Sequence, residues 1–68
     1  MGIQLEIDKG FSSTTFTVKD DYGFNSKSIS VDNWRVSDYQ LEQARNAMNY
    51  AYDVDSAMQQ VKQALGIY

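Results

Sequence analysis

The side chains that could do chemistry in this chain are carboxylates and hydroxyls, because its 68 residues include neither histidine nor cysteine. Histidine is the usual acid–base group near neutral pH, and both missing residues are common zinc ligands. Two acidic pairs are spaced so that one carboxyl group could act as acid and the other as base: Asp20-Asp21 and Asp53-Val54-Asp55. Aspartate at such positions also accepts backbone N–H groups in turns and at helix starts. We therefore expect both pairs to be structural and predict no catalytic residue.

Other catalytic and metal-binding patterns are missing from the sequence. A serine nucleophile would need lysine as its base here, and no Ser-x-x-Lys spacing occurs. No glycine-rich phosphate loop is present, and the stretch 20–25 lacks the alternating ligands of a calcium loop. The sequence thus favours a protein that is not an enzyme, with no metal site and no cofactor.

The net charge of −3 argues against nucleic acid as a partner, since such binding needs clustered lysines and arginines. The basic residues are scattered along the chain: Lys9, Lys19, Lys27, Arg35, Arg45 and Lys62. No apolar run approaches the length of a membrane span, and the N-terminus lacks a signal-peptide pattern. We expect a small acidic cytoplasmic protein with no membrane partner.

The first half of the chain alternates between apolar and polar residues, which predicts half-buried strands over about 2–8, 14–20 and 26–32. Gly10 and Gly23 lie in the intervening turns, where each can take a positive φ. In the first hairpin, Ile7 opposite Phe16 and Leu5 opposite Val18 would put the apolar side chains on one face. In the second hairpin, we expect Phe16 opposite Val31 and Val18 opposite Ile29.

After Trp34 the apolar spacing becomes helical, and Ser37 followed three residues later by Gln40 resembles a capping box. Two apolar stripes follow that are out of phase: Leu41, Ala44, Met48, Ala51 and Tyr52, then Val54, Ala57, Met58, Val61, Ala64 and Leu65. We predict two helices over about 38–52 and 55–65, with Gly66 ending the second. One bent helix is the alternative, because no proline or glycine enforces a break.

These elements predict a single α+β domain, in which a three-stranded antiparallel β-meander is followed by two α-helices packed on one sheet face. Trp34, at the junction of strand and helix, is expected to be a core residue. Ile67 and Tyr68 are expected to dock on the sheet or to join a homodimer interface.

With no catalytic residue predicted, the remaining candidates are residues that could contact a partner protein. On the first helix, Tyr39, Gln43, Asn46 and Tyr50 follow a 4, 3, 4 spacing opposite the core stripe, and tyrosine is common at interface anchors. Either this face binds a partner, or one tyrosine packs over the sheet edge or the second helix. Tyr22 and Phe24 project from the second turn as a further contact or fold back over the core. Acidic residues are expected to support binding to a basic surface: Asp20, Asp21, Asp38, Glu42, Asp53 and Asp55.

We expect a non-enzymatic protein-binding module that acts on another protein, with an inhibitor from a phage or mobile element that occludes a host enzyme as one form. The alternative is a self-assembling structural or accessory protein whose exposed aromatic side chains form a homo-oligomer interface.

Overall fold

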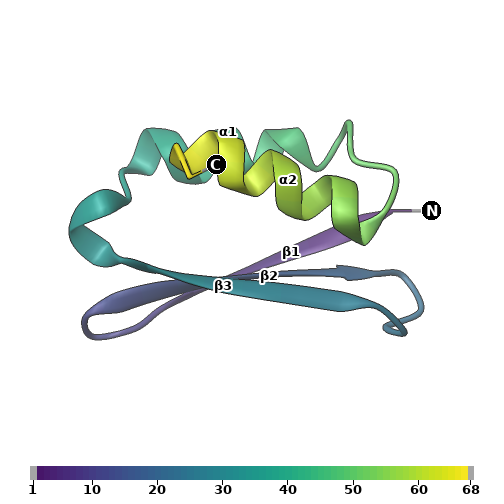
Figure 1. Cartoon of the computed structure of the whole chain (residues 1–68), viewed down its shortest axis with the longest axis horizontal. Coiled ribbons are helices and arrows are strands. Elements are labelled where there is room, and N and C mark those ends of the chain that lie inside the picture. Colours follow the sequence, from purple (N-terminus) through teal and green to yellow (C-terminus); the bar gives the residue numbers. More distant parts are fainter. Residues whose placement is uncertain (1, 68) are drawn as a thin grey trace.

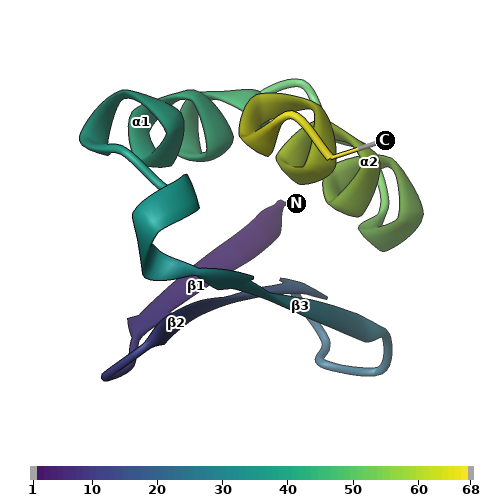
Figure 2. The ribbon, with the colours of Figure 1, turned by 60° about the vertical axis from the view of Figure 1, so that its left-hand side comes forward.

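A computed structural model describes residues 2–67, which form two layers (Figures 1 and 2). One layer is an antiparallel sheet in the order β1-β2-β3, built from β1 (Ile3–Lys9), β2 (Ser13–Asp20) and β3 (Ser26–Asp32). A short 3₁₀ helix, η1 (Asn33–Arg35), leads to the second layer, α1 (Asp38–Ala47) and α2 (Val54–Leu65). Both helices lie on one face of the sheet, which confirms the predicted α+β fold.

The first hairpin has the predicted register, whereas the second is shifted by two residues. Ile7 pairs with Phe16 and Leu5 with Val18, as expected. In the second hairpin Phe16 pairs with Ile29, and Val18 with Lys27, so the predicted partners were wrong. The tight turn explains the shift, because the Asp20 amide donates to the Asn25 carbonyl at 3.2 Å. A shift of two residues leaves every side chain on its predicted face.

The two turn glycines have different functions. Gly23 has a φ of 74°, which confirms the expected left-handed residue. Gly10 does not use this freedom, since its φ is not positive. A Cβ at Gly10 would instead lie 2.9 Å from the Ser13 carbonyl oxygen, so close backbone approach excludes a side chain there.

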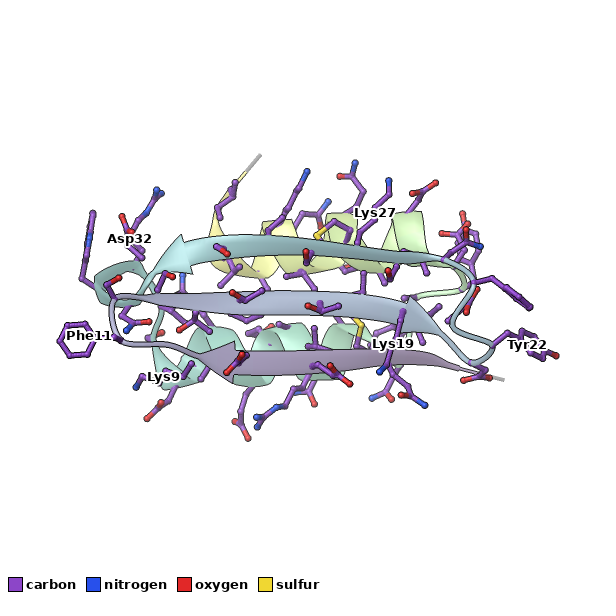
Figure 3. The ribbon with its side chains drawn as sticks, turned by 90° about the horizontal axis from the view of Figure 1, so that it is seen from below. Lys9, Phe11, Lys19, Tyr22, Lys27 and Asp32 are labelled. Atoms are coloured by element: carbon purple, nitrogen blue, oxygen red, sulfur yellow. The ribbon has the colours of Figure 1, made fainter. Side chains whose placement is uncertain are left out.

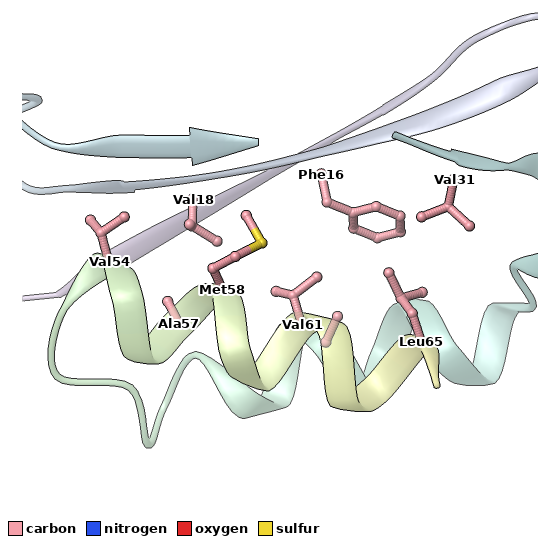
Figure 4. Close-up of a cluster of buried hydrophobic side chains, with 9 residues drawn as sticks. Phe16, Val18, Val31, Val54, Ala57, Met58, Val61 and Leu65 are labelled. Atoms are coloured by element: carbon pink, nitrogen blue, oxygen red, sulfur yellow. The ribbon is translucent and has the colours of Figure 1, made fainter. Parts of the chain in front are cut away.

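The core lies between the central strand and α2 (Figure 4). Phe16, Val18 and Val61 are fully buried, and α2 adds Ala57 and Leu65. Burial of each large side chain of this kind contributes about 1.5–3 kcal/mol to folding. The α2 stripe predicted from the sequence is therefore the main helical contribution to the core.

The two helices begin as predicted, but α1 ends earlier than expected. The Ser37–Gln40 capping box is present at the start of α1, and Asp53 caps α2 through its bond to the Ser56 amide. α1 ends at Ala47. The amides of Met48, Asn49 and Tyr50 donate to carbonyls three residues back, instead of the four residues of an α-helix. Tyr52 therefore lies in the connecting loop and is 84% exposed, so its predicted place in the core stripe was wrong.

Trp34 is not a core residue, contrary to expectation, and is 82% exposed. The inward position belongs to its neighbour Asn33, whose amide group donates to the carbonyls of Gly10 and Phe11 at 3.1 and 3.3 Å. The Trp34 ring faces solvent, with the Arg35 guanidinium 5.8 Å from its centroid. Ile67 is partly buried against the core, and Tyr68 lies outside the described residues.

Candidate functional site

Large aromatic side chains are exposed at both ends of the elongated molecule. Phe11 and Tyr22 lie at opposite ends of the sheet, on the first and second turns (Figure 3). Within residues 2–67 the exposed aromatic residues are Phe11, Tyr22, Phe24, Trp34, Tyr39, Tyr50 and Tyr52. Aromatic side chains of this size are more often at least partly buried, so their exposure marks them as candidates for contact.

The predicted surface on α1 is exposed, and we call it the α1 face: Tyr39, Gln43, Asn46 and Tyr50. Its members do not gather at one point. Tyr39 lies in the first turn of α1, at the end of the molecule away from the β2–β3 turn (Figure 1). Tyr50 follows the last turn of that helix. The α1 face is therefore an extended strip of aromatic and amide groups, and Tyr39 is remote from Tyr22 and Phe24.

A second group of aromatic residues meets at the opposite end, and we call it the turn-end surface: Tyr22, Phe24 and Tyr52. The rings of Tyr22 and Phe24 stack with centroids 6.3 Å apart and an interplanar angle of 29°. Both side chains remain more than three-quarters exposed, so Phe24 does not fold back over the core. Tyr52 reaches this end from the α1–α2 loop, and it lines a cavity together with Tyr22.

This cavity has a volume of about 370 Å³ and lies between the start of β1, the β2–β3 turn and the α1–α2 loop. These segments are far apart in sequence but share one end of the molecule in Figure 1. Three of the predicted acidic residues also line it, Asp20, Asp21 and Asp53. The cavity thus combines tyrosine rings, apolar surface and carboxylates.

The acidic residues at this end are held by local bonds. Asp20 accepts the Phe24 amide at 3.1 Å, which closes the turn, and Asp53 accepts the Ser56 amide at 2.6 Å. Asp21 accepts the amide of Gly2. Asp55 forms an ion pair with Lys27 beside the cavity. These bonds give the aspartates the structural function expected for them and fix where their negative charge lies.

Asp38 and Glu42 belong to the exposed surface of α1, away from the cavity. Asp38 lies in the first turn, where a negative charge is favourable beside the positive end of the helix dipole. The predicted acidic contacts therefore divide into a group around the cavity and a pair on α1.

Sequence reasoning missed Tyr52 and Asn25 as cavity residues. For Tyr52, the sequence did contain a signal. Asn46 and Asn49 are poor helix formers, so they indicate that the first helix ends before residue 52 and leaves Tyr52 in the loop. For Asn25, the signal depended on the register of the second hairpin. In the observed register Asn25 lies opposite Asp20, whereas the predicted register placed it opposite Tyr22 within the turn.

The open face of the sheet offers hydroxyl groups and short polar contacts (Figure 3). Lys19 binds the Glu6 carboxylate at 2.6 Å, and the hydroxyls of Thr15 and Ser30 are 3.1 Å apart. In the strands β1 to β3 no aromatic side chain lies on this face, so it lacks the stacking platforms that single-stranded nucleic acids use.

Over residues 2–67, no group of three or more acidic side chains is arranged to hold a metal ion. Neither described helix has the length and apolar character needed to cross a bilayer. Comparisons with protein-family models, curated proteins and solved structures gave no significant match.

Proposed function

We propose that this chain is a non-enzymatic protein-binding module that contacts its partner through the turn-end surface. The observation that supports this most is the gathering of Tyr22, Phe24 and Tyr52 beside a cavity. Tyrosine and phenylalanine bury large areas at little cost in side-chain entropy, and they are common in the centres of protein interfaces. Tyr22 and Phe24 already stack in the unbound chain, so this pair has less side-chain freedom to lose on binding.

The turn-end surface also suits the inhibitor expected from the sequence, which would act by covering a surface of a host enzyme. An inhibitor of this kind needs contact area and no reactive group. The α1 face, remote from the cavity at its Tyr39 end, would then be peripheral or unused.

Capture from a lysate of the source cell tests the proposal. The baits are the full chain, its Tyr22→Ala/Tyr52→Ala variant, and its Tyr39→Ala/Gln43→Ala variant as an α1 control. We expect one protein to be captured by the full chain and the control, and lost from the first variant. Capture by all three baits alike would refute the turn-end surface as the binding site, and loss only from the α1 variant would move the site to α1.

The open edge of β3 favours self-assembly as a second candidate. Backbone hydrogen bonds join Asp20 to Asn25 and Asn33 to Ser12. Along an antiparallel strand, every second residue bonds to the neighbouring strand. In β3 the residues whose backbone groups bond to β2 are therefore Lys27, Ile29 and Val31. The backbone groups of Ser28 and Ser30 then point away from the sheet. No other strand of residues 2–67 pairs with this edge. An unpaired edge is a template for a strand from another copy.

Sedimentation at micromolar concentration separates the two candidates. Self-assembly through β3 predicts a dimer that Ser28→Pro dissociates, since proline removes only an outward amide and the fold is kept. A monomer at these concentrations would exclude self-assembly and leave the binding module.

A further inference from the structure

The cavity at the turn end has walls of two kinds. Ile3, Ala51 and Val54 give it apolar surface, and Tyr22 and Tyr52 also line it. Its volume of about 370 Å³ lies at the small end of the range for ligand pockets. A cavity of this size suits one long side chain of a partner better than a whole cofactor.

Carboxylates are prominent in the lining of the cavity. Among residues 2–67, the charged side chains that line it are those of Asp20, Asp21 and Asp53. The nearby Lys27 lines a neighbouring hollow that Asp53 also lines, and there it forms an ion pair with Asp55. Carboxylates gathered in the lining of a cavity favour a cation as the occupant.

Asp53 has the geometry to receive such a cation. Its Oδ1 accepts the Ser56 amide at 2.6 Å, which orients the carboxylate and leaves Oδ2 for a ligand. Asp20 is held at both oxygens, since Oδ1 accepts the Phe24 amide at 3.1 Å and Oδ2 accepts the Asn25 side-chain amide at 3.4 Å. Both carboxylates are thus positioned before a ligand arrives.

The tyrosines decide which cation fits best. The Tyr22 ring stacks on Phe24, and Tyr52 lines the same cavity from the α1–α2 loop. A planar guanidinium stacks on aromatic rings and also bonds carboxylates through two parallel N–H groups, whereas an ammonium group does neither as well.

We infer that this cavity binds the side chain of an arginine presented by an exposed segment of the partner protein. The inference rests on the proposed function, since it names the chemistry by which the turn-end surface would recognise its partner. Apolar walls would contact the methylene groups of the arginine, tyrosine rings would stack on the guanidinium, and Asp53 would accept its N–H groups.

The test uses three short blocked peptides that differ only at a central residue: arginine, its neutral analogue citrulline, or lysine. Binding to the full chain is followed by shifts of backbone amide signals in NMR spectra. We expect the arginine peptide to shift the signals of Tyr22, Asn25 and Val54. The lysine peptide should bind about threefold to tenfold more weakly, and citrulline at least tenfold more weakly. Equal binding of citrulline or lysine, or shifts confined to α1, would overturn the inference.

Variants of the chain locate the site. Asp53→Asn keeps a capping side chain at the start of α2, so loss of binding in it reports lost charge rather than unfolding. Asp53→Asn and Tyr52→Ala should each weaken arginine binding about fivefold to tenfold. Glu42→Gln and Tyr39→Ala remove the same groups from α1 and should leave binding unchanged. Equal losses in both sets would overturn the assignment.

The peptide test and the capture experiment distinguish failure of the arginine inference from failure of the proposed function. If a partner is lost on Tyr22→Ala/Tyr52→Ala but the arginine peptide does not bind, the arginine inference is wrong and the proposed function stands. If the peptide binds at the cavity and no protein is captured, the proposed function is wrong. The cavity is then a cation site without a protein partner, which also overturns the partner named in the inference.

Discussion

The hydroxyl of Thr14 donates a hydrogen bond of 2.6 Å to the side-chain carbonyl of Asn33. Thr14 is 3% exposed and lies on the core face of β2, and Asn33 opens η1. The amide group of Asn33 binds the carbonyls of Gly10 and Phe11 in the first turn. One side chain therefore ties the strand-to-helix junction to the sheet and leaves Trp34 outside.

Replacement of Thr14 by valine should lower stability by about 1 kcal/mol, because valine keeps the shape and removes the bond to Asn33. For a chain of this size, such a change lowers the melting temperature by about 4–8 °C. Thermal unfolding followed by circular dichroism measures it. Thr15→Val is the matched control on the open face, where loss of the contact with Ser30 should cost less than about 0.5 kcal/mol. Equal stability losses in Thr14→Val and Thr15→Val would show that the Thr14–Asn33 hydrogen bond stabilises the fold no more than an exposed contact does.

Two phenylalanines provide a matched test of the core. Phe16 is 0% exposed and Phe24 is 86% exposed. Phe16→Ala should cost about 3–5 kcal/mol, enough to unfold much of a chain of this length. Phe24→Ala should change stability by less than about 0.5 kcal/mol. Urea unfolding gives both values, and a large loss in Phe24→Ala would place that ring in the core instead of on the turn-end surface.

Gly66 ends α2 with a φ of 74°, a conformation that costs an alanine about 1–2 kcal/mol. Gly66→Ala should therefore be destabilising by about that amount in chemical denaturation. Gly2 is the control, since a Cβ there meets only an Asp21 oxygen at 3.8 Å. If Gly2→Ala and Gly66→Ala were equally stable, α2 would not end in the left-handed residue described.

Asp53 should contribute to folding through its capping bond rather than through its charge. Asp53→Ala is expected to lose about 1 kcal/mol, whereas Asp53→Asn should stay within about 0.5 kcal/mol of the parent chain. Helical circular dichroism during thermal unfolding distinguishes the two variants. Similar losses in both would mean that the negative charge itself stabilises α2, and Asp53→Asn would then be unsuitable as a binding probe.

The sequence was sufficient for the two-layer fold because alternation and helical spacing each report which face is buried. Ser37, Asp53 and Gly66 have local capping chemistry, so their positions were also predictable. The second register depended on the hydrogen bonds of one turn, and a two-residue shift leaves the apolar pattern unchanged. Pattern alone therefore could not distinguish the two pairings.

The candidate site was predicted in part. Tyr22, Phe24 and the aspartates around the cavity were named from the sequence, but their meeting with Tyr52 was not. That meeting depends on where α1 ends, and α1 ends without a glycine or proline to indicate it. Trp34 was expected in the core because it lies at the junction of strand and helix, whereas the adjacent Asn33 points inward and forms the hydrogen bonds there.

The most direct measurement is the affinity of the captured and purified partner for three forms of the full chain, by isothermal titration calorimetry. The forms are the parent, Tyr22→Ala/Tyr52→Ala and Tyr39→Ala/Gln43→Ala, each first shown to be folded by circular dichroism. We expect the turn-end variant to bind at least tenfold more weakly, a loss of about 1.4 kcal/mol or more. The α1 variant should bind within about threefold of the parent. A turn-end variant that binds as tightly as the parent would contradict the turn-end surface as the binding site.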